Sequence, residues 1–232
     1  MPSAYSKTIV CLANSRKPFG RCIAGREALE HGYGGWIRPV SVRASAEISL
    51  EERRFGNGRE PRILDVIGIP MIAAVPKLHQ TENHLIDADF YWSEKRALTW
   101  ADLPNLVERP ETLWTNDGST YHGMNDAIGA TAASQLTNSL FLIKPENLHV
   151  QVQVEGGMYG PAKRRVRAEF RYNGTGYRFM VTDPIAEQVF LVRADAVFTL
   201  KNIYVCVSLT EPFEGDGRCH KLVATIISEG PL

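Results

Sequence analysis

Two short runs of strand-forming residues, 166–172 and 177–181, lie on either side of the tetrapeptide Asn-Gly-Thr-Gly. An Asn-Gly pair between two such runs is the strongest short-range signal for a β-hairpin, because the turn needs residues that accept positive φ. Just upstream, Val150, Val152 and Val154 alternate with glutamines, as in a strand with one buried face. This part of the chain therefore predicts antiparallel β-structure.

The chain after the hairpin predicts a helix followed by two strands. Asp183 and Pro184 are a favoured N-cap and first helical residue, so we expect a short helix over residues 183–192. Residues 203–209 and 222–227 are apolar, strand-like runs joined by a Gly- and Pro-containing loop. The resulting order of three strands, a helix and two strands is that of a five-stranded OB barrel.

The N-terminal half also begins with three short strand candidates, at residues 8–13, 21–24 and 35–40. An apolar run from residue 63 is interrupted by prolines and predicts one or two bent strands. Residues 94–103 contain good helix formers, and residues 114–125 have the composition of a long surface loop. We therefore predict a mainly β protein of two tandem OB-like barrels with short helices and loop insertions. The boundary is placed between residues 1–145, which carry the insertions, and 146–232.

Composition limits the kinds of partner that the chain can have. The 232 residues are 44% hydrophobic and 22% charged, as in an ordinary globular protein, and the formal net charge is zero. Binding through bulk charge is therefore not expected, although a local patch can still bind nucleic acid. The apolar run near the N-terminus is too short for a signal peptide or a membrane span, so we expect a cytoplasmic protein without membrane contact. The four cysteines form no CxxC pair, and we expect no cofactor and no metal.

A cationic stretch near the N-terminus is the first candidate site. Arginine matches phosphate with a planar, always charged fork, and tryptophan offers a face on which a base can stack. We therefore predict ligand contacts from Asn14, Ser15, Arg16, Lys17, Arg21, Trp36 and Arg38. In the alternative interpretation Trp36 is a core residue, and Arg16 and Arg38 pair with carboxylates of the second barrel. Asp126 and Glu211 are candidate partners of the N-terminal arginines.

The predicted hairpin carries the second candidate site. Alternation places Arg165, Arg167 and Arg171 on one face of a strand and apolar residues on the other. Tyr177 on the neighbouring strand is expected to add a stacking surface, since OB barrels bind oligonucleotides on the face of their second and third strands. The alternative is a solvated sheet face without a ligand.

The segment from His79 to Asn83 is the third candidate. The segment is compatible with a metal or acid–base site, with a hydrogen-bonded loop brace and with a ligand contact. The two histidines of this region do not have the spacing of a helical HExxH motif, and Pro76 argues against a helix here, so the brace is favoured. The chain also contains no Walker-type or GxSxG motif, which weakens hydrolase interpretations.

Several motifs in order resemble the prokaryotic dual OB-containing domain family. They are IVCLANSRK, GRCIAG and GGWIRPVS near the N-terminus, HQTEN and YW in the middle, and FRYNGTGYRFMVTDP, VSLTEPF and HKLVATII near the C-terminus. The resemblance extends from about residue 7 to residue 227. It implies two OB-like barrels in tandem and a nucleic-acid role in mobile-element or defence systems.

These observations favour a non-catalytic module that binds nucleic acid, with single-stranded DNA or RNA as the expected ligand. A partner protein would then supply any catalysis. One alternative is an enzyme acting on a nucleotide or modified base, with Asn14, Arg16, Arg38 and the 79–83 loop closing a pocket between the barrels. The other is a protein-interaction adaptor, which would present an exposed apolar patch.

Overall fold

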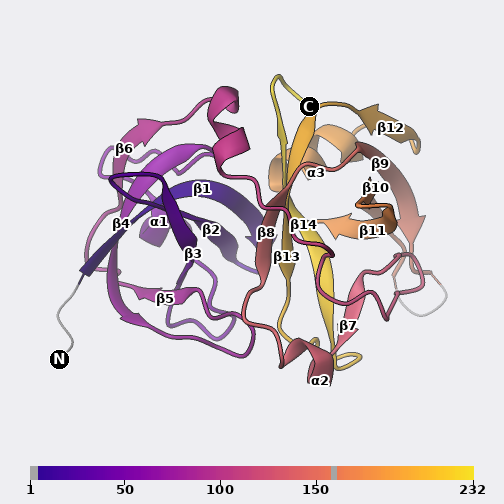
Figure 1. Cartoon of the computed structure of the whole chain (residues 1–232), viewed down its shortest axis with the longest axis horizontal. Coiled ribbons are helices and arrows are strands. Elements are labelled where there is room, and N and C mark those ends of the chain that lie inside the picture. The colour runs from indigo at the N-terminus through magenta and orange to yellow at the C-terminus, as the bar shows by residue number, and fades with distance from the viewer. Residues whose placement is uncertain (1–4, 158–160) are drawn as a thin grey trace. The chain divides into compact units, whose positions relative to one another are not determined.

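The computed structural model describes residues 5–157 and 161–232. The chain forms two compact units, Met1–Leu106 and Val107–Leu232. Figure 1 shows the elements of the first unit in indigo to magenta and most strands of the second in orange to yellow.

The described residues of the first unit form six strands and two short helical segments. The strands are β1 (Tyr5–Lys17), β2 (Gly20–Ala28), β3 (Tyr33–Val40), β4 (Asp65–Ala74), β5 (Asn83–Ile86) and β6 (Ser93–Ala97). The helical segments are α1 (Leu50–Arg53) and the 3-10 helix η1 (Trp100–Asn105).

Five of these strands close into a barrel. Strand β1 pairs with β2, β2 with β3, β3 with β5 and β5 with β4, and β4 returns to pair with β1. Only the β3–β5 pair is parallel. A barrel with the strand order 1-2-3-5-4-1 is an OB fold, and β6 is an addition on the outer edge of β4.

The first barrel is filled by branched aliphatic side chains. Ile9, Ile23, Ile37 and Ile67 are at most 5% exposed and pack together. Strands β1 and β2 cross closely at Gly25, where an added Cβ would lie 1.9 Å from the Val10 carbonyl oxygen. Glycine at this position lets the two strands approach closely enough to close the small barrel.

In the part of the second unit that the structure describes, the chain forms eight strands and two helices. The strands are β7 (Ala127–Gly129), β8 (Leu140–Ile143), β9 (Asn147–Glu155), β10 (Lys163–Tyr172), β11 (Thr175–Val181), β12 (Val197–Leu200), β13 (Ile203–Leu209) and β14 (Arg218–Ser228). The helices are α2 (Ala130–Ala133) and α3 (Pro184–Leu191).

The second sheet has the OB order with extra strands at its ends. Its path is β9-β10-β11-β14-β13, the β11–β14 pair is parallel, and α3 lies between the third and fourth barrel strands in the chain. Strand β12 extends the sheet beyond β9, β8 extends it beyond β13, and β7 pairs with β14. The predicted mainly β architecture of two OB-like units is therefore confirmed.

Two local predictions in this unit are also confirmed. The β10–β11 hairpin turns at Asn173 and Gly174, whose φ values of 47° and 75° are both positive. Asp183 caps α3 by accepting hydrogen bonds from the backbone N–H of Ile185 and Ala186, at 2.9 and 3.3 Å. Its second carboxylate oxygen accepts from Ile226 N–H, which links the helix to β14. Burial raises the pKa of Asp183 against the opposing effect of these three donors.

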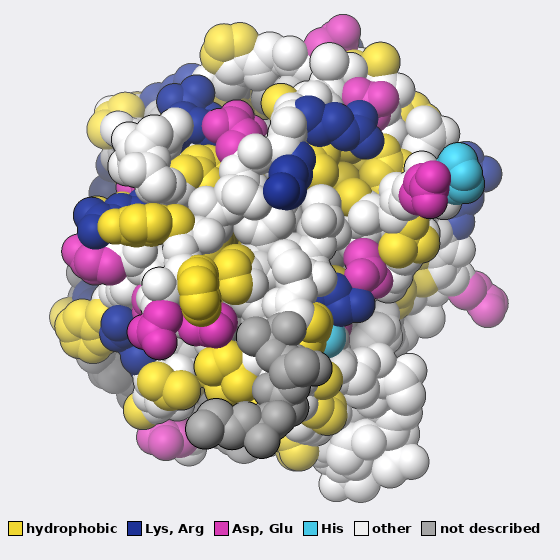
Figure 2. All heavy atoms as spheres, turned by 90° about the vertical axis from the view of Figure 1, so that its left-hand side faces the viewer, with side chains coloured by type: hydrophobic (Ala, Val, Ile, Leu, Met, Phe, Trp, Pro, Cys, Tyr) yellow, Lys and Arg dark blue, Asp and Glu magenta, His cyan; other side chains and the backbone are white. Residues whose placement is uncertain are grey.

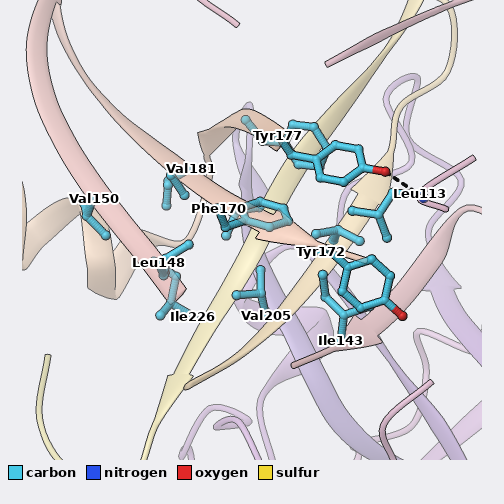
Figure 3. Packing of buried hydrophobic residues seen from close by; sticks show 14 of the residues in the cluster. Leu113, Ile143, Leu148, Val150, Phe170, Tyr172, Tyr177, Val181, Val205 and Ile226 are labelled. Atoms are coloured by element: carbon cyan, nitrogen blue, oxygen red, sulfur yellow. Dashed lines mark hydrogen bonds between the residues drawn. The ribbon is translucent and has the colours of Figure 1, made fainter. Parts of the chain in front are cut away.

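A cluster of aromatic rings and a buried cation lie in the core of the second barrel. Phe170, Tyr177 and Phe179 pack with centroid separations of 5.4–5.5 Å, and Figure 3 shows the first two rings in the core. Lys221 of β14 is only 1% exposed, and its ammonium lies 5.5 Å from the centroid of the Tyr177 ring. It donates hydrogen bonds to the Thr115 carbonyl oxygen at 2.6 Å and to Asn116 Oδ1 at 3.1 Å. Burial lowers the pKa of Lys221 to about 7.

Two expectations from the sequence differ from the structure. The unit boundary follows Leu106, and residues 107–145 lie in the second unit because β8 pairs with β13 and β7 with β14. The helix expected over residues 94–103 is wrong in its first half, which forms β6. Backbone pairing with β4 outweighs the helix propensity of these residues, and only η1 is helical.

None of the helices in the described ranges is both long enough and apolar enough to span a lipid bilayer.

Candidate nucleic-acid interface

The outer face of strands β9, β10 and β11 in the second unit is built by strict alternation along β10. Val166, Ala168 and Phe170 point into the core and are at most 1% exposed. Arg165, Arg167, Glu169 and Arg171 alternate with them and lie on the opposite face. The predicted division of this strand into an apolar and a cationic face is confirmed. We call the outer surface of β9–β11 the strand face.

Arg167 is not an accessible cation of the strand face. Its guanidinium donates to both carboxylate oxygens of Glu155, at 2.6 and 3.0 Å, and lies 3.5 Å from Asp126 Oδ2. All three side chains are at most 10% exposed. Burial alone would raise the pKa of Glu155, but hydrogen bonds from Arg167 and Gln153 and the charge of Arg167 hold it below its usual value. The predicted ligand contact of Arg167 is therefore wrong, because its guanidinium is buried in an ion pair with Glu155.

Arg178 of β11 organises the glutamines of β9. It donates hydrogen bonds to Gln151 Oε1 and, at 3.1 Å, to Gln153 Oε1. Its nearest carboxylate in the described chain is Glu169, 4.0 Å away. The guanidinium thus crosses β10 and fixes two amide groups, which are able to donate hydrogen bonds to a ligand.

Arg165 and Arg171 are two further cations of the strand face; Arg171 is exposed and Arg165 is partly buried. Neither forms an ion pair with any residue in the described parts of the chain. Arg171 donates to the Gly174 carbonyl oxygen at 2.7 Å, and its cross-strand neighbour on β11 is Gly176, which has no side chain to cover it. Both positions suit contacts with an anion.

A loop beside β11 adds an exposed aromatic ring. Tyr121 is 96% exposed and meets His122 edge to face at 4.8 Å between centroids. Asp126 holds the loop by accepting hydrogen bonds from Thr120 N–H and Oγ1–H, both at 2.6 Å. Met124 pairs with the backbone of Arg178, so the loop is anchored to the edge of β11. The ring of Tyr121 is thus carried next to the strand face.

Tyr177 does not supply the stacking surface that the sequence predicts. It points to the inner face of β11 and is 0% exposed. Its hydroxyl accepts a hydrogen bond from Leu113 N–H at 3.3 Å, as Figure 3 shows, and lies 3.1 Å from Thr112 Oγ1. The alternation that exposes Arg178 on β11 buries Tyr177.

Part of the predicted N-terminal surface is buried. Arg38 is 4% exposed and forms an ion pair with Glu82 at 3.1 Å within the first unit. Ser15 is also buried, and Asn14 donates to the Pro61 carbonyl oxygen at 3.1 Å. Of the remaining predicted contacts, Arg16 is exposed, and Lys17, Arg21 and Trp36 are partly buried. Arg38 and Ser15 therefore cannot form the predicted open surface.

His79 lies in the loop between β4 and β5, and Asn83 is the first residue of β5. They are 1% and 4% exposed, and Asn83 Nδ2 donates to Gln80 Oε1 at 3.4 Å. Lys77 and Gln80 exchange backbone hydrogen bonds across the loop. This geometry favours the loop-brace interpretation over a surface ligand contact. Within residues 5–157 and 161–232, no group of three or more His, Cys, Asp or Glu side chains is placed to hold a metal ion.

Sequence reasoning did not single out Tyr121, Gln151 or Gln153 as binding residues. The alternation of β9 could have found the two glutamines, because it places them on the face of Arg165. Tyr121 lies in a loop whose anchoring depends on Asp126, and this tertiary contact has no local sequence signal. Of the predicted carboxylate partners, Asp126 contacts Arg167 of its own unit.

The fold and this surface define a class of protein with two OB-like units, one of which carries a cationic face on its second and third barrel strands. A protein-family model with the description "Dual OB-containing domain" matches residues 7–226. The chain therefore belongs to this family. A comparison with curated proteins gave no match. One solved structure, titled "Crystal structure of the tetrameric p202 HIN2", is 10% identical, with a TM-score of 0.30 over 96% of this chain and 89% of that chain. A similarity this low supports no inference.

Proposed function

We propose that the protein is a non-catalytic nucleic-acid-binding module that takes single-stranded DNA or RNA on the strand face. The observation that supports this most is the position of Arg165 and Arg171. They lie on the second barrel strand, on the face that OB folds use for oligonucleotides, and form no ion pair within the described residues. A guanidinium in this position matches a phosphate with two parallel hydrogen bonds.

The composition of the strand face favours a single strand over a duplex. Arg178 holds Gln151 and Gln153 on the same face, which places amide donors and acceptors beside the cations. The exposed ring of Tyr121 can stack on an unpaired base. In a duplex the faces of the bases are already occupied by their neighbours, so this combination of groups is more useful against a single strand.

The charge distribution fits local rather than bulk attraction. The chain has a formal net charge of zero. Figure 2 shows basic, acidic and hydrophobic side chains interspersed on one face of the molecule, with no single sign prevailing there. Binding would therefore depend on a few arginines at defined positions. Each lost phosphate contact should make the slope of log binding constant against log salt concentration less steep by a fixed amount.

The test is fluorescence anisotropy with single-stranded and double-stranded DNA and RNA of the same sequence at several salt concentrations. Arg165→Glu with Arg171→Glu should abolish measurable binding, because two phosphate contacts become two repulsions. The matched control is Arg109→Glu with Lys201→Glu, which changes the net charge equally at exposed positions of the second unit outside β9–β11. Wild-type binding that is insensitive to salt, or equal loss in both double variants, would contradict the proposal.

A role in prokaryotic defence or in mobile elements stays a prediction of the family resemblance, and a partner protein that supplies catalysis stays a prediction from the sequence. Pull-down from the source cell with and without nuclease treatment would test the partner directly.

A further inference from the structure

The β1–β2 hairpin of the first barrel ends in an exposed phenylalanine. Lys17 pairs with Gly20 in register, so the turn consists of Pro18 and Phe19 alone. Phe19 is 97% exposed and has a φ of 62°. It is the most exposed large hydrophobic residue of the described chain.

Phe19 is unfavourable for the isolated protein on two counts. A proline followed by a residue with positive φ is the pattern of a type II turn, in which Gly or Asn is preferred at the second position. An aromatic residue is strained there, and its ring gains nothing from burial. Because Gly or Asn would make the same turn at lower cost, the fold itself gives no reason for phenylalanine at the tip.

The base of the hairpin is held firmly. Arg21 and Ile48 exchange two backbone hydrogen bonds of 2.9 Å just below the turn. Gly20 lies so close to this segment that an added Cβ would be 2.6 Å from the Ile48 carbonyl oxygen. The backbone on the C-terminal side of the turn is therefore fixed by packing and hydrogen bonds, which holds the tip and Phe19 at a defined position.

We infer that Phe19 stacks on an unpaired nucleobase, which makes the β1–β2 hairpin a second contact point for nucleic acid. The inference rests on the proposed function. The loop between the first and second strands is one of the two loops that OB folds use together with the strand 2–3 face. Lys17 precedes the turn, so a cation for the neighbouring phosphate accompanies the ring. A flat apolar ring beside a cation matches a base with its phosphate.

The test uses a single-stranded oligonucleotide that carries the fluorescent base 2-aminopurine at successive positions. Wild-type protein should change the fluorescence at one position or a few, where the base stacks on Phe19. Phe19→Ala should remove that change and weaken binding by roughly 5- to 100-fold, the range for loss of one base–aromatic stack. The salt dependence should stay the same, because no phosphate contact is lost. Phe90→Ala is the matched control, since Phe90 is an exposed aromatic of the same unit at 61%.

A second variant separates binding from folding. Phe19→Asn places a residue that accepts positive φ in the turn, so its melting temperature should rise above that of the wild type while its affinity falls as in Phe19→Ala. Wild-type affinity and fluorescence in both Phe19 variants would overturn the inference and leave the proposed function intact. Equal losses in Phe90→Ala would also overturn it. Absence of any wild-type binding to nucleic acid would instead refute the proposed function.

Discussion

The buried ammonium of Lys221 should make the stability of the protein rise with pH above neutrality. Burial lowers its pKa from an ordinary value of 10.5 to about 7 in the folded chain. Between these two values the unfolded chain holds the proton and the folded chain does not. The free energy of unfolding therefore increases by about 1.4 kcal/mol per pH unit across this window, or ~5 kcal/mol over its whole width.

Below pH 7 both states are protonated, so the dependence ends and the folded protein bears the full cost of the buried charge. Lys221→Met keeps most of the side-chain volume and removes the titrating group. The advantage of the variant over the wild type should be greatest at pH 6–7 and should shrink steadily toward pH 10. The variant also loses the hydrogen bonds to Thr115 and Asn116. This loss shifts the difference in free energy of unfolding between variant and wild type by an amount that is nearly independent of pH.

The measurement is guanidinium-induced unfolding of the full chain, followed by circular dichroism at half-unit pH intervals. All other titrating groups cancel when the variant is subtracted from the wild type. Lys201→Met, at an exposed lysine of the same unit, should give a difference that does not vary with pH. Parallel stability profiles for Lys221→Met and the wild type would refute the reasoning.

Three further substitutions test contacts of the second unit. Arg167→Met should lower the free energy of unfolding by about 3–5 kcal/mol, since it leaves Glu155 and Asp126 buried without their cation; unchanged denaturation midpoints would contradict the ion-pair geometry. Asp183→Ala should cost about 2–4 kcal/mol through the lost helix cap and the unpaired Ile226 N–H, with Asp183→Asn less affected, and hydrogen exchange at Ile226 should report the loss directly. Tyr177→Phe should cost ~1 kcal/mol without changing affinity for nucleic acid, whereas a binding defect in anisotropy would mean that the Tyr177 hydroxyl contacts the ligand.

Features that depend on neighbouring residues in the chain were predictable from the sequence. The Asn173–Gly174 turn, the Asp183 cap and the alternation of β10 each follow from a few adjacent side chains, and their order was enough to indicate OB-like units. The candidate site was predictable only in outline. Alternation divides the arginines from the apolar residues, but it does not show that Glu155 and Asp126 enclose Arg167.

The errors have the same origin. Residues 94–97 have good helix propensity, but β4 offers them an unpaired strand edge, and this partner lies about 30 residues earlier in the chain. The aromatic ring of Tyr177 suits both stacking on a base and packing in a core, so the residue type alone does not show which face of the strand it occupies. Which of these applies depends on the strand register, and the 112–116 segment that meets its hydroxyl has no pairing signal of its own.

Strand β14 follows the other described strands of its unit in sequence but occupies a central place in its sheet, where it pairs with β11, β13 and β7. During synthesis, β11 and β13 leave the ribosome before the strand that joins them in the sheet has been made. Strands β11 and β13 then present open edges and apolar faces until residues 218–228 have been translated. The second unit should therefore fold late and in one step, and a chain truncated before residue 218 should be recognised by chaperones and proteases as unfinished.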